Sequence, residues 1–345
     1  MTVTSSSIIK KLLLIFLITA GLFIARDFLI PLTIGALLAT LFLPLSKILE
    51  KWKLPKIVAL LICLFLLLLF FATIGALIGW QILELANDVD MLKQKSIQAL
   101  ASIQGYILNH AGVSVDKQVQ FLIDQQQFAL GLIQGMAGSL TSSFAFFALI
   151  IVYFVFLLSY RDHIKQFFLK LSSPAQREEM EKVVGGVVNV SQKYFLGLSK
   201  MILALWIMYG IGFSALGVKN AVFFAILCGI LELAPYIGNI IGVTITVLFS
   251  VAQGASFPTL LGIVGLYVVI QLIQGWAIEP FIVGSQVKVN PLFTIVALII
   301  GELLWGLPGI FLAIPLVAMV KIVCDHVESL KPYGFLIGEI KERKK

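Results

Sequence analysis

The sequence predicts an all-α polytopic membrane protein, and composition and apolar run length together support this class. Of its 345 residues 60% are hydrophobic and 12% are charged, with a mean hydropathy of +1.04. The charged share is roughly half that of an ordinary soluble domain. Apolar runs such as 57–80 and 144–160 reach or approach the ~20 residues that span a bilayer. Because such runs recur along nearly the whole chain, a soluble core is excluded.

Charge and cysteine usage exclude other classes of protein. The net charge is +7 and the isoelectric point is near 9.2, but the basic residues cluster in loops and tails, where they indicate membrane orientation rather than nucleic-acid binding. Cys63, Cys228 and Cys324 lie in or beside apolar segments without metal-like spacing, so we interpret them as packing residues. No nucleophile elbow, metal motif or phosphate-binding loop is present. The chain is therefore predicted to be no enzyme, with no metal and no cofactor.

Residues 1–80 are predicted to form N-terminal membrane helices that serve as a scaffold. Two apolar helices, 12–25 and 28–45, are separated by Arg26-Asp27, which we interpret as an interfacial ion pair. The loop after the second helix is basic, which places it and the N-terminus in the cytoplasm. The first helix lacks a clear A-x-A cleavage site and is expected to be retained. Residues 57–80 then cross outward.

The next 120 residues are predicted to leave and re-enter the membrane. Residues 81–139 have few basic side chains and read as an extracytoplasmic amphipathic segment, lying on the membrane or between subunits. Residues 140–200 read as a membrane helix followed by a basic cytoplasmic connector. Within the connector, Ser172-Ser173-Pro174 indicates the start of a helix over 176–188.

Residues 201–323 are predicted to form the transport pathway, and 324–345 a basic cytoplasmic tail. Two apolar stretches in the pathway, 220–249 and 291–320, are interrupted by Pro and Gly, and one clean crossing at 260–278 lies between them. We expect both to be re-entrant hairpins in an inverted arrangement, as at transporter binding sites. Two full crossings in each stretch would also leave the C-terminus inside, so that alternative stays open.

Few charges occur between 218 and 320, so each is a functional candidate. Glu232 and Glu302 each lie beside a helix break, where they are predicted to bind a proton or cation and couple it to transport, although a carboxyl that only braces the turn is the alternative. Glu279 and Lys288 border a short cytoplasmic loop and are either a gate or interfacial anchors.

Polar residues near the first break are predicted to line the substrate pathway: Tyr236, Asn239, Gln271 and Gln274. Gln271 and Gln274 lie on one face of a helix, and their alternative role is hydrogen bonding between helices. The prolines and glycines of the breaks are expected to shape the backbone rather than contact solute. They are Pro235, Gly238, Gly242, Gly306, Pro308, Gly309 and Pro315.

An ordered set of residues along most of the chain matches the pattern of one family of bacterial permeases. The set comprises Pro31, Ala39, Pro44-Leu45, Leu54-Pro55, Tyr194, Gly197, Pro235-Tyr236-Ile237-Gly238, Gln271, Glu279-Pro280, Gly284, Pro291-Leu292, Gly301, Gly306, Gly309 and Pro315.

These residues resemble the AI-2E family, the autoinducer-2 exporter-like permeases. The resemblance implies a homo-oligomer of the bacterial inner membrane, with about eight membrane segments, that exports a small polar signal; other members resemble sodium/proton antiporters. The chain departs from the family pattern at Leu198, Asn239 and Glu302, and the last two change polarity at the breaks themselves.

The sequence therefore predicts a permease that exports a small polar solute, such as an autoinducer-2-like signal, driven by an ion gradient. Its expected partners are that solute, H+ or Na+, and the lipid bilayer, with no nucleic acid. A sodium(cation)/proton antiporter is the alternative within the same fold. A non-transporting membrane scaffold or assembly factor is the alternative of another class, but it would have little reason to place carboxylates at two helix breaks.

Overall fold

The computed structural model describes residues 5–87, 140–233, 237–278 and 288–339, and these are almost entirely helical. Five helices among them are long and apolar enough to cross a membrane, or six if the bent pair α6–α7 counts as one span. This confirms an all-helical membrane protein. The elements are α1 (Ser5–Ile24), α2 (Arg26–Lys51), α3 (Lys56–Asn87), α6 (Leu140–Ser159), α7 (Arg161–Leu171), η1 (Pro174–Gln176), α8 (Arg177–Ala215), α9 (Ala221–Leu231), α10 (Ile237–Ala252), α11 (Phe257–Ile273), η2 (Gln274–Ile278), α13 (Pro291–Trp305), α14 (Leu307–His326), η4 (Glu328–Leu330) and α15 (Lys331–Ile337).

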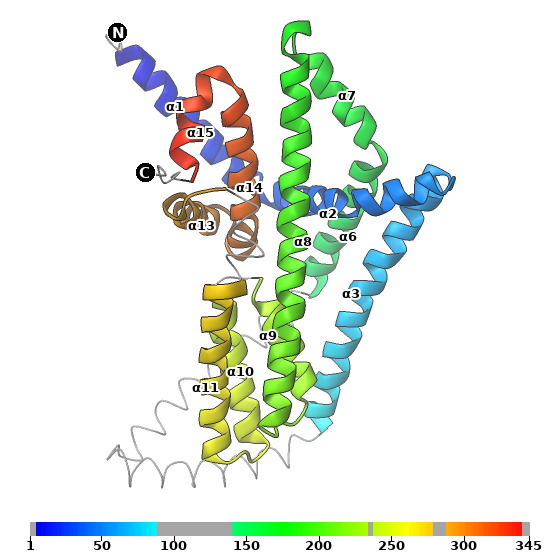
Figure 1. Ribbon diagram of the computed structural model, residues 1–345, viewed down its shortest axis with the longest axis vertical. Coiled ribbons are helices and arrows are strands. Elements are labelled where there is room, and N and C mark those ends of the chain that lie inside the picture. The colour runs from blue at the N-terminus through cyan, green and yellow to red at the C-terminus, as the bar shows by residue number, and fades with distance from the viewer. Residues whose placement is uncertain (1–4, 88–139, 234–236, 279–287, 340–345) are drawn as a thin grey trace, which may run out of the picture. The chain divides into compact units, whose positions relative to one another are not determined.

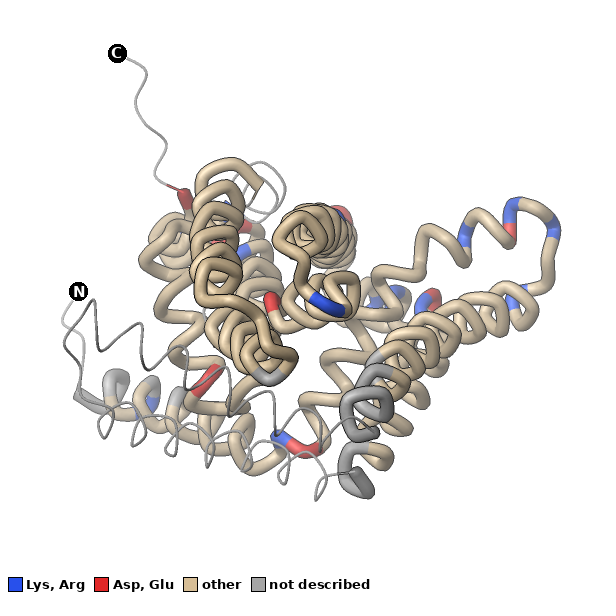
Figure 2. Tube along the Cα trace, turned by 90° about the horizontal axis from the view of Figure 1, so that it is seen from below, with Lys and Arg blue, Asp and Glu red and all other residues tan. Residues whose placement is uncertain are grey.

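The chain divides into two compact units, and each is described by itself. Unit 1 comprises 1–66, 147–198 and 281–345, and unit 2 comprises 67–146 and 199–280. Figure 1 shows the course of the helices along the chain. Charged residues are sparse on most of them, and Figure 2 shows long stretches of helix with neither sign of charge. That distribution suits helices whose outer faces meet lipid.

In unit 1, the α13–α14 hairpin is held by a backbone contact. A Cβ atom added to Gly309 would overlap the backbone carbonyl of Gly301, and the reverse also holds. Between the two helices, Gly306 has φ 63° and ψ −142°, a conformation that side chains forbid. Pro308 then lies in the first turn of α14, where it leaves no helical hydrogen bond unmade. The second stretch is therefore interrupted between α13 and α14, at Gly306.

In unit 2, α10 packs against α9 and α11, and the C-terminal part of α8 contacts α9 and α11. A small residue permits a close approach here too. The indole of Trp206 occupies the place where a side chain at Gly229 would lie. The same indole donates a hydrogen bond from Nε1 to the backbone oxygen of Ile226, at 3.1 Å. The predicted break in the first stretch is present, since α9 ends at Leu231 and α10 begins at Ile237. The two helices have 11 and 16 residues, each shorter than a full span.

The helix predicted over 176–188 extends much further than expected. Residues Arg177–Ala215 form one continuous helix of 39 residues, about 58 Å long at 1.5 Å per residue. Charge near its start, including Glu178 and Lys182, lowers the local hydropathy without interrupting helical hydrogen bonding. Such i,i+4 pairs, here 2.9 Å apart, stabilise a helix outside the membrane as well.

Candidate functional site

Glu232 lies at the end of α9 and forms the centre of a buried polar cluster in unit 2. Its Oε1 atom accepts hydrogen bonds from Asn239 Nδ2 at 3.0 Å and from Gln274 Nε2 at 2.6 Å. The three residues are 5%, 8% and 5% exposed. A buried carboxylate is stable only when donors replace the water it has lost, and these two amide groups do so.

A fourth side chain closes the cluster into a ring. Asn239 Nδ2 also donates to Gln271 Oε1 at 2.9 Å, and Gln271 Nε2 in turn lies 3.4 Å from Gln274 Oε1. We call Glu232, Asn239, Gln271 and Gln274 the Glu232 ring. Its outer edge reaches α8, because Gln271 Nε2 also lies 3.4 Å from the hydroxyl of Tyr209.

Local sequence explains why the four side chains meet. A Cβ atom at Gly238 would overlap the backbone carbonyl of Leu231, so glycine lets α10 begin directly against the end of α9 and brings Asn239 to Glu232. Gln271 and Gln274 lie three residues apart, on one face of α11 and its continuation. Gln274 begins the π-helical turn η2, a kind of irregularity that is frequent at functional sites.

The ring combines one acidic group with three carboxamides. The carboxylate offers only acceptors when ionised, whereas each carboxamide offers both donors and acceptors. This arrangement can recognise the hydroxyl groups of a small polar solute, and the carboxylate can take up a proton or a cation. The described residues contain no group of three or more His, Cys, Asp or Glu that could hold a metal ion.

Comparison with known proteins places this architecture in a family. The sequence model of one protein family, described as the AI-2E family transporter, matches residues 12–329. The chain belongs to the AI-2E transporter family. The AI-2 transport protein TqsA of Escherichia coli is 22% identical over 343 residues, covering 98% of this chain and 97% of TqsA. The Bacillus subtilis protein YueF is 27% identical over 339 residues, covering 91% of this chain and 90% of YueF.

Not every residue predicted for this AI-2E chain joins the ring. Tyr236, Pro235 and Glu279 lie outside the described residues. Glu302 lies in α13 of unit 1 with an exposed side chain, and its backbone oxygen accepts the hydrogen bond from Gly306 N that ends the helix. Lys288 is exposed just before α13, with φ 51°.

Further polar groups follow α10 away from the ring and were missed from the sequence. Thr246 Oγ1 donates to the backbone oxygen of Gly242 at 2.8 Å and lies 3.7 Å from Cys228 Sγ. Ser250, one turn later, is 2% exposed, and its hydroxyl has no partner among the described residues. In the sequence, Thr246 and Ser250 follow Asn239 at helical spacing within an apolar run, and this pattern could have indicated them.

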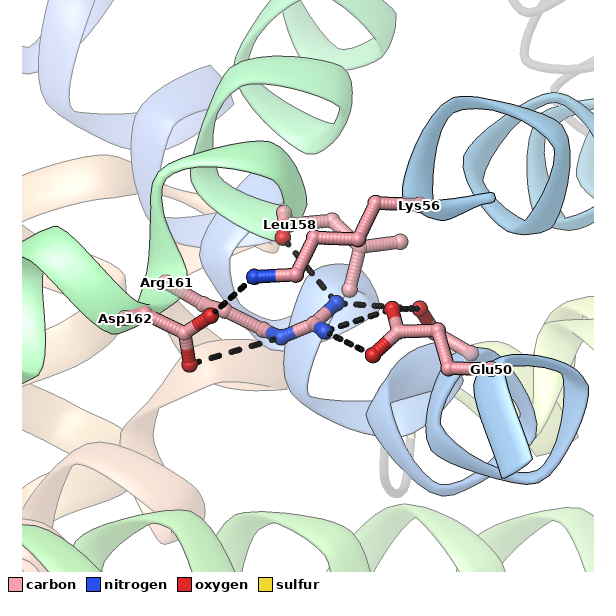
Figure 3. Close-up of polar contacts among 6 residues, drawn as sticks. Glu50, Lys56, Leu158, Arg161 and Asp162 are labelled. Atoms are coloured by element: carbon pink, nitrogen blue, oxygen red, sulfur yellow. Dashed lines mark hydrogen bonds and ion pairs between the residues drawn. The ribbon is translucent and has the colours of Figure 1, made fainter. Parts of the chain in front are cut away.

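Unit 1 of this AI-2E protein contains a second polar cluster, where α6 bends by 67° into α7 (Figure 3). Arg161 Nη2 donates to both carboxylate oxygens of Glu50, at 2.6 and 2.7 Å, and Nη1 donates to Ser46 Oγ at 3.0 Å. Beside them, Lys56 Nζ donates to Asp162 at 2.8 Å. The first pair is largely shielded, with side chains 16% and 22% exposed, and it fixes the bend against α2. Sequence reasoning treated these residues only as orientation signals.

Proposed function

We propose that this protein exports a small polar solute, such as an autoinducer-2-like signal, driven by an ion gradient, with Glu232 as the coupling residue. The observation that carries the proposal is the buried carboxylate bound by two carboxamides at the break between α9 and α10. Buried ionisable groups within membrane helices are costly and usually functional.

The composition of the Glu232 ring supports a polar, uncharged cargo. Its three carboxamides can replace hydrogen bonds that hydroxyl groups of a solute make with water, which lowers the cost of moving the solute into the membrane. Membership of the AI-2E family supports transport, and the similarity to the AI-2 transport protein TqsA makes AI-2 the first solute to test. Tyr236 is proposed to complete the pathway, with Glu279 and Lys288 as a gate.

Cation/proton antiport is the second candidate. The observation in its favour is that the Glu232 ring contains a carboxylate and three carboxamide oxygens, which are hard oxygen ligands of the kind that a small cation takes. The carboxamides of Asn239 and Gln274 donate to Glu232 through nitrogen, so in this version they turn to offer oxygen to the cation. In this version, Na+ and H+ compete for Glu232 without a solute. Glu302 is proposed as a second carboxylate of the pathway in either version.

The proposed setting is the inner membrane of a bacterium, with both termini cytoplasmic and several copies assembled as a homo-oligomer. Residues 201–323 would carry the pathway, and residues 1–80 would serve as scaffold. The basic loops support this orientation. We also propose that the two broken stretches re-enter the membrane rather than cross it. The lengths of α9 and α10, each shorter than a full span, support re-entry for 220–249.

The test uses the purified full-length protein in proteoliposomes. Vesicles are given AI-2, Na+ or neither, under an imposed pH gradient, while solute accumulation and internal pH are recorded. Gradient-driven accumulation of AI-2 supports the exporter, and Na+-dependent collapse of the pH gradient without solute supports the antiporter. Protein-free vesicles are the control. The absence of both fluxes would contradict transport and favour a membrane scaffold.

A further inference from the structure

The C-terminal segment of unit 1 turns back along the end of α14. After α14 ends at His326, the chain passes through η4 and continues into α15. A Cβ atom at Gly334 would lie 3.1 Å from the backbone nitrogen of Asp325, and one at Gly338 would lie 3.2 Å from Lys321 Cε. Gly338, directly after α15, thus meets the earlier residue of α14, so the two segments are antiparallel. Figure 1 shows α15 beside α14.

This return path has a defined depth. The apolar run of α14 ends at Val320, and Lys321 and Asp325, paired at 2.5 Å, are its first charges. Those charges indicate the level at which α14 leaves the hydrocarbon for the headgroups. Because α15 lies against residues 321–325, it lies at that level too.

Hydrogen bonds hold the segment there. Asn290, the N-cap of α13, donates from its backbone nitrogen to Ile337 O at 2.9 Å. Its Nδ2 atom donates to Leu336 O at 2.8 Å and to Gly338 O at 3.1 Å. Val289 and Gly338 also form an antiparallel bridge. These bonds to the residues at the start of α13 therefore fix the position of α15.

The face of α15 that points away from the protein is apolar. Gly334 and Ile337 are buried, whereas Tyr333, Phe335 and Leu336 are 55%, 88% and 57% exposed. An exposed phenylalanine beside a tyrosine is costly in water but typical of the interfacial zone of a membrane.

The same segment is basic. Residues 331–345 contain five Lys or Arg and two Glu. Lys331 is among them, and a hydrogen bond to the Glu328 carboxylate, at 2.5 Å, raises its pKa above the ordinary value. Basic residues next to exposed apolar side chains are attracted to anionic lipid headgroups.

We propose that α15 is an interfacial anchor: Tyr333, Phe335 and Leu336 insert into the membrane surface at the level where α14 ends, and the basic residues of the same stretch of sequence bind anionic headgroups. Through Asn290 the anchor ties the start of α13 to the membrane surface. This proposal does not depend on the cargo, and it holds for a transporter or a scaffold alike.

The test places a nitroxide at position 335 of the full-length protein in vesicles of phosphatidylglycerol and phosphatidylethanolamine. Phe335→Cys and Glu328→Cys are compared, because Phe335 and the Glu328 side chain are both 88% exposed. Exposure alone predicts the same environment for the two labels. The native chain treated with the same reagent gives the background, since its three cysteines are buried.

The measured quantity is collision with oxygen, which concentrates in lipid, relative to collision with a water-soluble nickel complex. We expect a ratio several-fold higher at 335 than at 328, and a decrease when phosphatidylcholine replaces the anionic lipid. Equal ratios at the two positions would overturn insertion. Low collision with both reagents at 335 would also overturn it, because protein would then cover this face. An unchanged ratio in phosphatidylcholine would overturn the assignment of anionic headgroups.

Discussion

Neutralising Glu232 should uncouple solute movement from the proton gradient. In Glu232→Gln the side chain keeps its shape, and its remaining oxygen can still accept from Asn239 and Gln274, which lie 3.0 and 2.6 Å from Oε1. Each of these bonds loses the assistance of a charge, about 1 kcal/mol, but the cost of burying that charge disappears as well. We therefore expect an intact fold with no group left in the ring to take up the proton.

The magnitude follows from the free energy of a pH gradient. One pH unit is worth about 1.4 kcal/mol, so exchange of one proton for each solute molecule predicts about tenfold accumulation per unit. For Glu232→Gln we expect a ratio of about one at every gradient. Accumulation is measured in proteoliposomes with labelled AI-2, with Glu178→Gln as control because that side chain is 84% exposed. Retention of tenfold accumulation per unit by Glu232→Gln would refute the coupling role.

Three further substitutions test other parts of the structure. Arg161→Ala should destabilise the protein by about 2–4 kcal/mol, because it leaves a shielded Glu50 carboxylate unpaired. Its control, Lys56→Ala, removes an exposed ion pair and should cost less than about 1 kcal/mol. Thermal unfolding, followed by a thiol-reactive dye that labels the buried cysteines as they become exposed, compares the two variants. Gly309→Ala should destabilise the protein by at least about 1–3 kcal/mol, since the added methyl overlaps the backbone of Gly301. Its control in the same assay, Gly265→Ala in α11, should be neutral or stabilising, because an added Cβ there meets open space. Equal effects of the two substitutions would contradict the backbone contact. Glu302→Gln should slow flux several-fold and leave the accumulation ratio unchanged, because within the described part of the chain no donors hold this exposed carboxylate in the way the ring holds Glu232. A changed ratio would instead make it a coupling residue.

The two helix breaks could be predicted from sequence because their causes are local. A backbone conformation that only glycine adopts readily, such as that of Gly306, requires glycine in the sequence, and this glycine is visible within an apolar run. The pairing of Gln271 with Gln274 was also predictable, because helical spacing alone puts them on one face. Closure of the ring through Asn239 was not, since it depends on how closely α10 approaches the end of α9.

Contacts between distant residues could not be predicted from one sequence. Arg161 and Glu50 are 111 residues apart, and their charges serve equally well as orientation signals, so no pattern distinguishes a shielded pair from two solvated loops. Tyr209 was missed for a related reason, because one hydroxyl hardly alters the hydropathy of an apolar helix. The continuity of α8 was missed since membrane spans are recognised by apolar length, whereas helices continue for as long as backbone hydrogen bonds do.

The contact between Gly301 and Gly309 has a mechanical consequence. At this point backbone meets backbone, so no rotamer change there can relieve the contact and let one helix slide past the other. The two helices are thus expected to move as a single stiff lever. Any bending in this part of the protein is then confined to the ends of the lever, near Asn290 and Val327, and those ends are where distance probes would report a conformational cycle.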